Sequence, residues 1–527
     1  MSWLVPLIVL VPLLGAAITL TAARKQRLQI LLASVTMVLA LAISIALIVA
    51  VHTADQPLVI QVGGWAAPFG ISLVVDRLSA LMVLVTSIVL IAVMAFSIGQ
   101  GATDGDDETP VSIFYPTYLV LAAGVYNAFI AGDLFNLYVG FEILLVASFV
   151  LITLGGTASR IRAGITYIVV SLVSSLIFLA AIAAIFAAVG TVNFAEIAIR
   201  MAELPQEVQL PLHLLLLVGF GIKAALFPLS FWLPDSYPSA PAPVTAVFAG
   251  LLTKVGVYAI LRSESLLFAQ NDISVLLIVV AMLTMVIGIL GAVAQAGIRR
   301  MLSFTLVSHI GYMIFGIALG TEAGWAATVY YIAHHILVQT ALFLVTGLIE
   351  RIAGTATLTH LAGMLQRSPF VAVIFFVPML NLGGIPPFSG FIGKLGLFIA
   401  GAEGTALEVP QWLVWTGIGV GALTSLLTLY ALIRVWNLGF WRSQDEVAGF
   451  DSQLMTKLEE IPGGDVVSES KANSIVMNTA TAVMVGVTIC MTVFAGQIYE
   501  FADAAAANLT IPAAYVDGVS GTEGIKP

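Results

Sequence analysis

The sequence predicts an all-α polytopic membrane protein with about fourteen transmembrane helices. Three observations lead to this expectation. The chain of 527 residues is 60% hydrophobic and only 9% charged, whereas soluble domains contain about 25% charged residues. Its mean hydropathy is +1.07. The apolar residues also gather in long runs, and about 20 such residues are needed to cross the hydrocarbon core of a bilayer.

Fourteen apolar runs are long enough to cross about 30 Å of hydrocarbon at about 1.5 Å per residue. They lie near residues 2–22, 28–51, 77–99, 112–131, 133–154, 163–189, 208–232, 241–262, 272–297, 302–320, 325–349, 370–400, 411–436 and 475–500. The first run precedes its cations Arg24, Lys25 and Arg27. A signal peptide carries its positive charge before the apolar stretch, so we expect a retained first span. The single cysteine, Cys490, excludes an intrachain disulfide.

The cationic residues predict the orientation. Placing the N-terminus outside puts thirteen cations in inner loops, four on the outer side and three lysines inside the membrane. Cytoplasmic loops are enriched in Lys and Arg, so we expect both termini outside. The loops are too short for a soluble domain, and the polar stretch 437–474 is expected to be a cytoplasmic surface segment. The net charge of −9 reflects these loops and does not indicate a nucleic-acid partner.

Two spans are interrupted by proline. The seventh contains Pro228, and the twelfth contains Pro386 and Pro387. Proline removes a backbone donor, and irregular backbone at membrane depth is tolerated only inside protein or beside water. Spans 4–8 and 9–13 then form two inverted five-helix repeats with the broken helix fourth in each, a pattern typical of transport sites. The predicted divisions are 1–110, 111–265, 266–436, 437–474 and 475–527.

Titratable residues fall near the middle of several spans. Counted from the expected helix starts, Lys254 lies about 16 Å deep, and Glu142 and His335 lie about 14–15 Å deep. A charge at the bilayer centre costs about 2.5–3.5 kcal/mol even on the insertion scale, which gives the lowest values. Charged residues with this cost are not expected to be retained for packing alone. The sequence therefore predicts a proton relay that runs parallel to the membrane through Glu142, Lys223, Lys254, His335 and Lys394.

Other histidines are weaker candidates. His334 and His309 are possible relay members, although adjacent histidines face different sides of a helix. For each candidate the alternative is a static ion pair or a side chain that reaches toward the interface. His213 and His360 lie near span ends and are expected to be structural. No metal-ligand spacing, phosphate loop or nucleophilic triad occurs in the sequence, so we expect no metal, no bound cofactor and no independent enzyme activity.

Four stretches carry a family resemblance. They are "FIAGDLFNLYVGFEILL", "KAALFPLSFWLPDSYPSAPAPVTAVFAGLLTKVGVYAI", "RRMLSFTLVSHIGYM" and "GGIPPFSGFIGKL". They resemble the proton-translocating antiporter-like superfamily, which includes membrane-arm subunits of respiratory NADH dehydrogenase and large subunits of Mrp-type sodium/proton antiporters. The resemblance covers roughly residues 70–435. Within it, "SFWLPDSYPSAPAPVTA" is similar to the D subunits of the Mrp antiporters.

The resemblance implies roles and partners. Glu142 and Lys223 would form an ion pair between the fifth and seventh spans, Lys254 would connect the two halves, and Lys394 would end the relay. One departure is Gln339, which stands where many relatives have a lysine, so that the relay through this span would depend on His335. The resemblance also implies a hetero-oligomeric complex in a bacterial plasma membrane, with sodium and protons as substrates.

Two alternatives stay open from the sequence. One is a proton-pumping subunit of a respiratory NADH dehydrogenase or a hydrogenase-type complex, driven by electron transfer. The other is a structural scaffold whose partners alone transport ions. Exchange driven by an imposed ion gradient, without an electron donor, would favour the antiporter.

Overall fold

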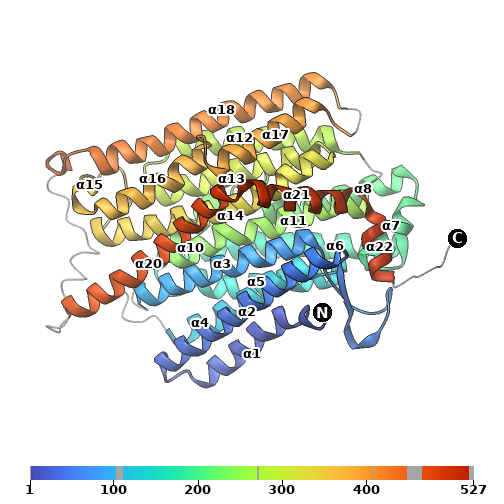
Figure 1. The fold of residues 1–527 in the computed structure, drawn as a ribbon, viewed down its shortest axis with the longest axis horizontal. Helices are drawn as coiled ribbons and strands as arrows, with labels where there is room; N and C mark the ends of the chain where they lie inside the picture. The colour runs from blue at the N-terminus through green and yellow to red at the C-terminus, as the bar shows by residue number, and fades with distance from the viewer. Residues whose placement is uncertain (1, 102–110, 270–271, 407–408, 448–465, 521–527) are drawn as a thin grey trace.

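The computed structural model describes residues 2–101, 111–269, 272–406, 409–447 and 466–520. The chain forms a bundle of long helices that run roughly side by side (Figure 1). Much of the predicted surface segment 437–474, namely residues 448–465, lies outside the described residues. The long helices are α1 (Leu7–Thr21), α2 (Gln26–Ala54), α3 (Arg77–Gln100), α4 (Val111–Ile130), α5 (Leu134–Thr153), α6 (Ala158–Val189), α8 (Gln206–Ala224), α12 (Ser274–Val293), α13 (Ile298–Ala318), α14 (Glu322–Ala353), α16 (Pro369–Gly383), α17 (Ser389–Glu403), α18 (Gln411–Val435), α20 (Val466–Val493) and α21 (Ala495–Thr510).

Shorter elements connect these helices. One central helix is composite, because α10 (Ala242–Val247) and α11 (Thr253–Arg262) continue through two π-helical segments. The remaining elements are β1 (Leu58–Gln61), β2 (Ser72–Val75), α7 (Phe194–Ala202), α9 (Leu233–Ser236), α15 (Met364–Arg367), α22 (Pro512–Ser520), the π-helical segments η4 (Phe248–Leu252), η5 (Ser263–Leu267) and η6 (Trp436–Trp441), and the 3₁₀ turns η1 (Ser2–Leu4), η2 (Val62–Gly64), η3 (Tyr237–Ser239) and η7 (Gln444–Val447).

Thirteen helices among the described residues are long and apolar enough to cross a membrane. They match thirteen of the fourteen predicted spans. The remaining predicted span, the twelfth at 370–400, is split into α16 and α17, so neither half reaches the length of a full span. Two other predicted boundaries were wrong. The seventh span ends at Ala224 instead of continuing to residue 232, and the last ends at Val493 before the separate helix α21.

The two ends of the bundle differ. Strands β1 and β2 pair antiparallel as a hairpin between α2 and α3, and β2 leads into Asp76, which caps α3 by accepting a hydrogen bond from the Ser79 amide. The hairpin, α7 and α22 lie at one end of the molecule, here called the hairpin end, and α15 lies at the other (Figure 1). These strands were not predicted from the sequence.

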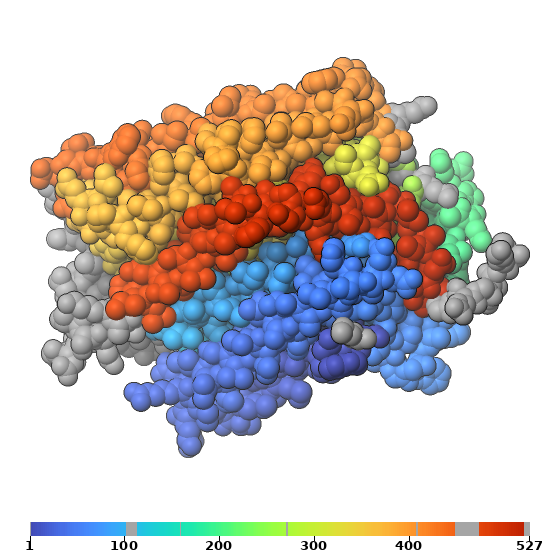
Figure 2. All heavy atoms as spheres, in the orientation of Figure 1, coloured from blue at the N-terminus to red at the C-terminus, as the bar shows by residue number. Residues whose placement is uncertain are grey.

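Burial separates central helices from peripheral ones. The most apolar 18-residue windows of Ala242–Leu267 and of α14 are completely buried by neighbouring helices. Large apolar side chains are instead exposed along α2, α6, α12 and α18, as expected of helix faces in contact with lipid. The segment from α20 to α21 crosses one face diagonally, between the N-terminal helices and α16–α18 (Figure 2), and α21 packs on α14. The two most enclosed helices are thus those that carry Lys254 and the paired histidines.

Candidate functional site

The first part of the site joins a carboxylate to a lysine through a hydroxyl. Ser175 of α6 donates a hydrogen bond of 2.5 Å to Glu142 Oε1 of α5. Lys223 Nζ of α8 donates to the same Ser175 oxygen at 3.1 Å and lies 4.9 Å from the centre of the Phe141 ring. The expected pairing of Glu142 with Lys223 is therefore bridged by Ser175, and the described residues contain no direct ion pair between them.

The end of α8 fixes Lys223. Ala225 adopts a left-handed conformation with φ of 59°, which turns the chain back immediately after Lys223. The Leu226 amide and the Trp232 indole then donate to the carbonyls of Gly221 and Ile222. These bonds satisfy carbonyls that the broken helix would leave unpaired. The Pro228 stretch thus ends the helix in protein and holds Lys223 at the point where it ends.

A small cavity lies beside Lys223. Its volume is about 20 Å³, and Leu252 of η4 lines it together with Lys223. A polar cavity holds a water molecule once it exceeds about 10–15 Å³. There is room for one water between the end of α8 and the segment that leads to Lys254.

Lys254 is fully buried directly after the π-helical segment η4. Its Nζ donates a hydrogen bond of 2.6 Å to the Ala249 carbonyl, five residues earlier. No acidic side chain of the described residues forms an ion pair with it. A π-helical turn disturbs the normal carbonyl pairing of an α-helix and often occurs at functional sites. Here it accompanies a neutral backbone acceptor for the lysine.

Two glycines bring the helix of Lys254 against both neighbouring parts of the site. A Cβ on Gly256 would lie 2.6 Å from the amide nitrogen of Ala224, next to Lys223. A Cβ on Gly250 would lie 2.4 Å from Thr340 Oγ1 and 3.6 Å from the Ile336 carbonyl, both on α14. Only glycine permits such close approach, so Lys254 lies between the end of α8 and the histidine helix.

Three buried histidines follow. The rings of His335 and His309 lie 5.1 Å apart. His309 Nδ1 contacts the Tyr331 hydroxyl at 2.8 Å, while His334 Nδ1 contacts the Ser389 hydroxyl at 3.0 Å. Among the described residues, neither ring nitrogen of His335 has a hydrogen-bond partner, and His334 Nε2 also lacks one. Both adjacent histidines face protein, because α14 is enclosed on every side.

Gln339 lies one turn beyond His335. Its amide donates to the Leu302 carbonyl at 2.7 Å, while its buried Oε1 has no partner among the described residues. Unpaired buried polar atoms cost about 1–3 kcal/mol each, so native proteins contain few of them. Several gather along α14 and the helices around it, which indicates a polar interior suited to water: Thr253, His334, His335, Gln339 and Asn381.

Lys394 ends the series at the break between α16 and α17. Its Nζ donates to the Leu382 carbonyl at 3.0 Å and to the Ser425 hydroxyl at 2.9 Å, and it lies 5.3 Å from the centre of the Tyr312 ring. Asn381 Oδ1 accepts hydrogen bonds from the Gly390 amide and the Ser389 hydroxyl. The break around Pro386 and Pro387 therefore supplies the carbonyl acceptor that holds the lysine.

Comparisons with known proteins cover this whole series. Residues 131–428 match the transmembrane family described as NADH:quinone oxidoreductase/Mrp antiporter. A protein of Alkalihalophilus pseudofirmus, named as the D subunit of a Na(+)/H(+) antiporter, is 39% identical over 456 residues, which is 85% of this chain and 90% of the relative. This chain belongs to the NADH:quinone oxidoreductase/Mrp antiporter family. The matched range includes every residue from Glu142 to Lys394 discussed above.

Solved structures agree with the family. A chain in the Mrp complex from Dietzia sp. DQ12-45-1b is 32% identical, with a TM-score of 0.87 and coverage of 99% of both chains. A chain of the membrane-bound sulfane sulfur reductase, described as an archaeal respiratory membrane complex, is 25% identical with a TM-score of 0.84, covering 98% of this chain and 100% of that one. This chain therefore shares its fold with chains of two kinds of membrane complex.

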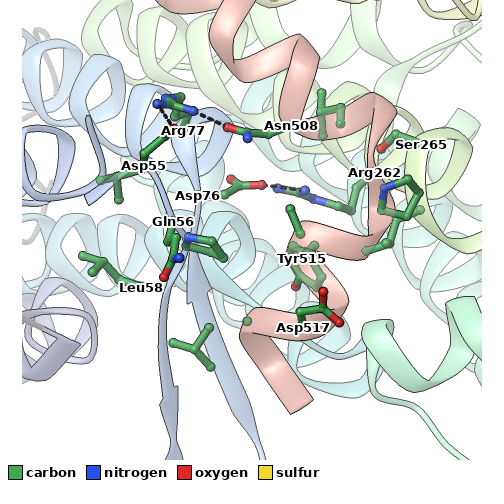
Figure 3. Close-up of a pocket in the computed structure, with 18 of the residues that line it drawn as sticks. Asp55, Gln56, Leu58, Asp76, Arg77, Arg262, Ser265, Asn508, Tyr515 and Asp517 are labelled. Atoms are coloured by element: carbon green, nitrogen blue, oxygen red, sulfur yellow. Dashed lines mark hydrogen bonds and ion pairs between the residues drawn. The ribbon is translucent and has the colours of Figure 1, made fainter. Parts of the chain in front are cut away.

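A larger cavity lies at the hairpin end of this family member. It has a volume of about 770 Å³, and its wall combines the α2–β1 connection, Arg262 and the C-terminal segment around Tyr515. Arg262 forms an ion pair of 2.7 Å with Asp76, while Arg77 contacts Asp55 and Asn508 (Figure 3). Burial alone would raise the pKa of Asp76, but the Arg262 charge and hydrogen bonds from Arg262 and Ser79 leave that pKa below its ordinary value. This ion pair was not predicted from the sequence.

The residues that the sequence analysis missed within the site are mostly neutral. Ser175, Ser389, Ser425, Tyr331 and Asn381 contact the candidate titratable groups or their partners. A serine or tyrosine inside an apolar helix gives no distinctive spacing, because such residues also occur as ordinary packing groups. The break after Pro386 was the one signal that could have directed attention to Asn381 and Ser389.

Proposed function

We propose that this chain is a proton-translocating subunit of a multisubunit cation/proton antiporter and that it couples proton movement to sodium efflux. The name of the relative with 39% identity, which describes the D subunit of a Na(+)/H(+) antiporter, supports this assignment over most of both chains. The likeness to a chain of the Mrp complex supports assembly with other membrane subunits. The observation that carries the proton role is the series of titratable groups that runs from the half-buried Glu142 through buried lysines and histidines to Lys394, held by hydroxyls and carbonyls.

The bridge at Ser175 supports a switch at the start of the relay. An ionised Glu142 favours the charged form of Lys223 through the shared hydroxyl. When Glu142 accepts a proton, Lys223 loses this stabilisation and releases its own proton toward Lys254. The small cavity beside Lys223 has room for the water that such a transfer needs.

The environment of Lys254 suits a group that changes charge in each cycle. Its Ala249 acceptor is neutral, and no carboxylate among the described residues pairs with the ammonium form. Lysine deprotonates readily when buried, whereas arginine does not. From Lys254 the proton reaches His335, then His309 or His334 with their hydroxyl partners, and finally Lys394.

Three substitutions of Lys254 test the relay. Lys254→Arg keeps the charge but does not deprotonate, Lys254→Met keeps bulk without charge, and Lys254→Ala loses both. We expect all three to be nearly inactive in sodium-driven pH change measured in inverted vesicles that contain the whole complex. Active Lys254→Arg would rule out deprotonation of this residue, and active Lys254→Met would indicate packing alone. Purification of the assembled complex of each variant is the control.

A second candidate function is proton pumping in an electron-transfer complex. The TM-score of 0.84 to a chain of a respiratory sulfur reductase supports this second candidate, because that chain has the same fold. The same vesicles separate the two. Exchange driven by an imposed sodium gradient without an electron donor supports the antiporter, whereas proton movement that appears only with a donor supports the pump.

A further inference from the structure

A buried histidine that pairs with a glutamate lies away from the relay, at the hairpin end. His213 Nε2 of α8 contacts Glu264 Oε1 of η5 at 2.6 Å. The His213 side chain is fully buried and its ring stacks on Phe268, with centroids 4.3 Å apart and the planes inclined by 3°. The Glu264 side chain is 12% exposed. One partner therefore faces the protein interior while the other reaches its edge.

The two members of the pair lie on the helical segments that carry Lys223 and Lys254. His213 precedes Lys223 by ten residues on α8, and Glu264 follows Lys254 by ten residues through α11 and η5. Each separation is about 15 Å at 1.5 Å per residue. The two segments touch where Gly256 meets Ala224, so they run together from the relay to the hairpin end.

Glu264 opens onto a cavity of about 230 Å³. Thr510 of the C-terminal segment also lines it. It shares Ser265, Leu509 and Pro512 with the larger cavity of Figure 3. Ser265 is 2% exposed, and its hydroxyl has no partner among the described residues. A space of this size holds several waters, and a buried unpaired hydroxyl is a typical site for one.

Two arginines near the pair are engaged with other carboxylates. Arg262 pairs with Asp76, and Arg200 of α7 pairs with Glu196. The remaining charged groups on α8 and on helices packed against α8 or η5 are Glu207 of α8, Arg160 and Arg162 of α6, Glu500 and Asp503 of α21, and the relay residues Lys223 and Lys254. In the ion pairs of the described residues, the acidic partner of His213 is Glu264.

We propose that the His213–Glu264 pair is a proton-exchange site between the relay and the water at the hairpin end. Glu264 takes a proton from hydronium in the cavity, leaving water, and passes it to His213 Nε2 across the 2.6 Å contact. The transfer then needs a chain of waters along α8 and α11, about 15 Å long, to carry a proton from His213 to Lys223 or Lys254. The pair returns to its starting charge after each transfer. This inference rests on the proposed function, because it supplies protons to that relay.

Substitutions in the whole complex test the pair. Glu264→Gln and His213→Gln keep polar side chains at these positions but remove proton exchange there. A positioned proton-transfer group contributes about 10²–10⁴-fold to rate. We expect each variant to lower sodium/proton exchange about tenfold or more, with partial recovery when the water on the hairpin side is acidified. The matched control is Glu207→Gln, which alters an exposed carboxylate on the same helix and should leave exchange unchanged.

The outcomes separate this inference from the proposed function. Wild-type exchange in assembled Glu264→Gln and His213→Gln complexes, together with inactive Lys254→Arg, would overturn the exchange site and leave the relay intact. Active Lys254→Arg would instead overturn the relay. If both Gln variants fail to assemble while Glu264→Asp assembles and exchanges normally, the test uses Glu264→Asp. Its exchange rate is then measured as a function of pH on the hairpin side. A shifted pH dependence supports the site, and an unchanged one rejects it.

Discussion

The most specific prediction concerns Ser175, because one hydroxyl connects two groups of opposite charge. Ser175→Ala removes a donor to Glu142 at 2.5 Å and an acceptor for Lys223 at 3.1 Å in a residue that is only 4% exposed. A hydrogen bond to a charged group contributes about 1.5–3 kcal/mol. The two bonds are not additive, since Glu142 and Lys223 still attract each other without the bridge.

Taking the value of one such bond, the balance between the charged and neutral forms of Glu142 and Lys223 shifts by about 10- to 150-fold, because about 1.4 kcal/mol corresponds to a factor of ten. We therefore expect Ser175→Ala to slow sodium-driven exchange at least about tenfold in inverted vesicles. Ser175→Thr keeps the hydroxyl and should retain most of the activity. Size is not the reason for the effect, since Ser→Ala removes a single oxygen atom.

The neighbouring serine provides a matched control. Ser174 is also buried on α6, but its hydroxyl donates to the neutral Gly219 carbonyl at 3.0 Å. Ser174→Ala should lose about 0.5–1.5 kcal/mol of stability and leave exchange within about twofold of wild type. Equal loss of exchange in both alanine variants would indicate packing of α6 on α8. Wild-type exchange in an assembled Ser175→Ala complex would refute the bridge itself.

Two further predictions concern Gln339 and the orientation. Gln339→Lys should assemble and exchange, because the unpaired polar atoms around α14 indicate a polar interior; loss of the assembled complex, measured by purification, would show that this segment does not accept a charge. For orientation, the exposed Cys490 is first replaced by Ala. Ala513→Cys, exposed in α22, should then react with an impermeant thiol reagent in intact cells. Ala158→Cys, at the opposite end of the bundle, should react only in inverted vesicles, and the reverse pattern would overturn the placement of both termini outside.

The sequence was sufficient to predict the membrane fold and most of the spans. Long apolar runs have one stable solution in lipid, where every backbone group must be paired within a helix. The span ends were less predictable, as at Ala224 and Val493, since apolar residues continue past the point where the helix stops. The β hairpin was missed because its strands are short and lie between two strongly apolar runs. The inverted repeat and the orientation stay predictions.

The charged members of the site were predictable for an energetic reason. A lysine or glutamate in a transmembrane run is costly, so Lys223, Lys254, Lys394 and Glu142 stand out against their surroundings. Their partners do not stand out. Ser175 resembles any helix serine, and the π-helical segment before Lys254 leaves no mark in composition. The acceptor of Lys254 is a backbone carbonyl, which every residue possesses.

The three lysines of the site suggest why helix irregularities occur beside them. Lys223 lies in the last turn of α8, Lys254 follows a π-helical segment, and Lys394 faces the break between α16 and α17. Lys254 and Lys394 both donate to main-chain carbonyls at these irregularities. A carbonyl accepts from an ammonium group and yet carries no net charge, so the lysine keeps a partner without being held in its charged form. A carboxylate in the same place would stabilise the ammonium too strongly for each proton transfer. Within the described part of the chain, Lys223 alone of the three is linked to a carboxylate, through a hydroxyl, and that is the one lysine whose charge the proposed switch must control.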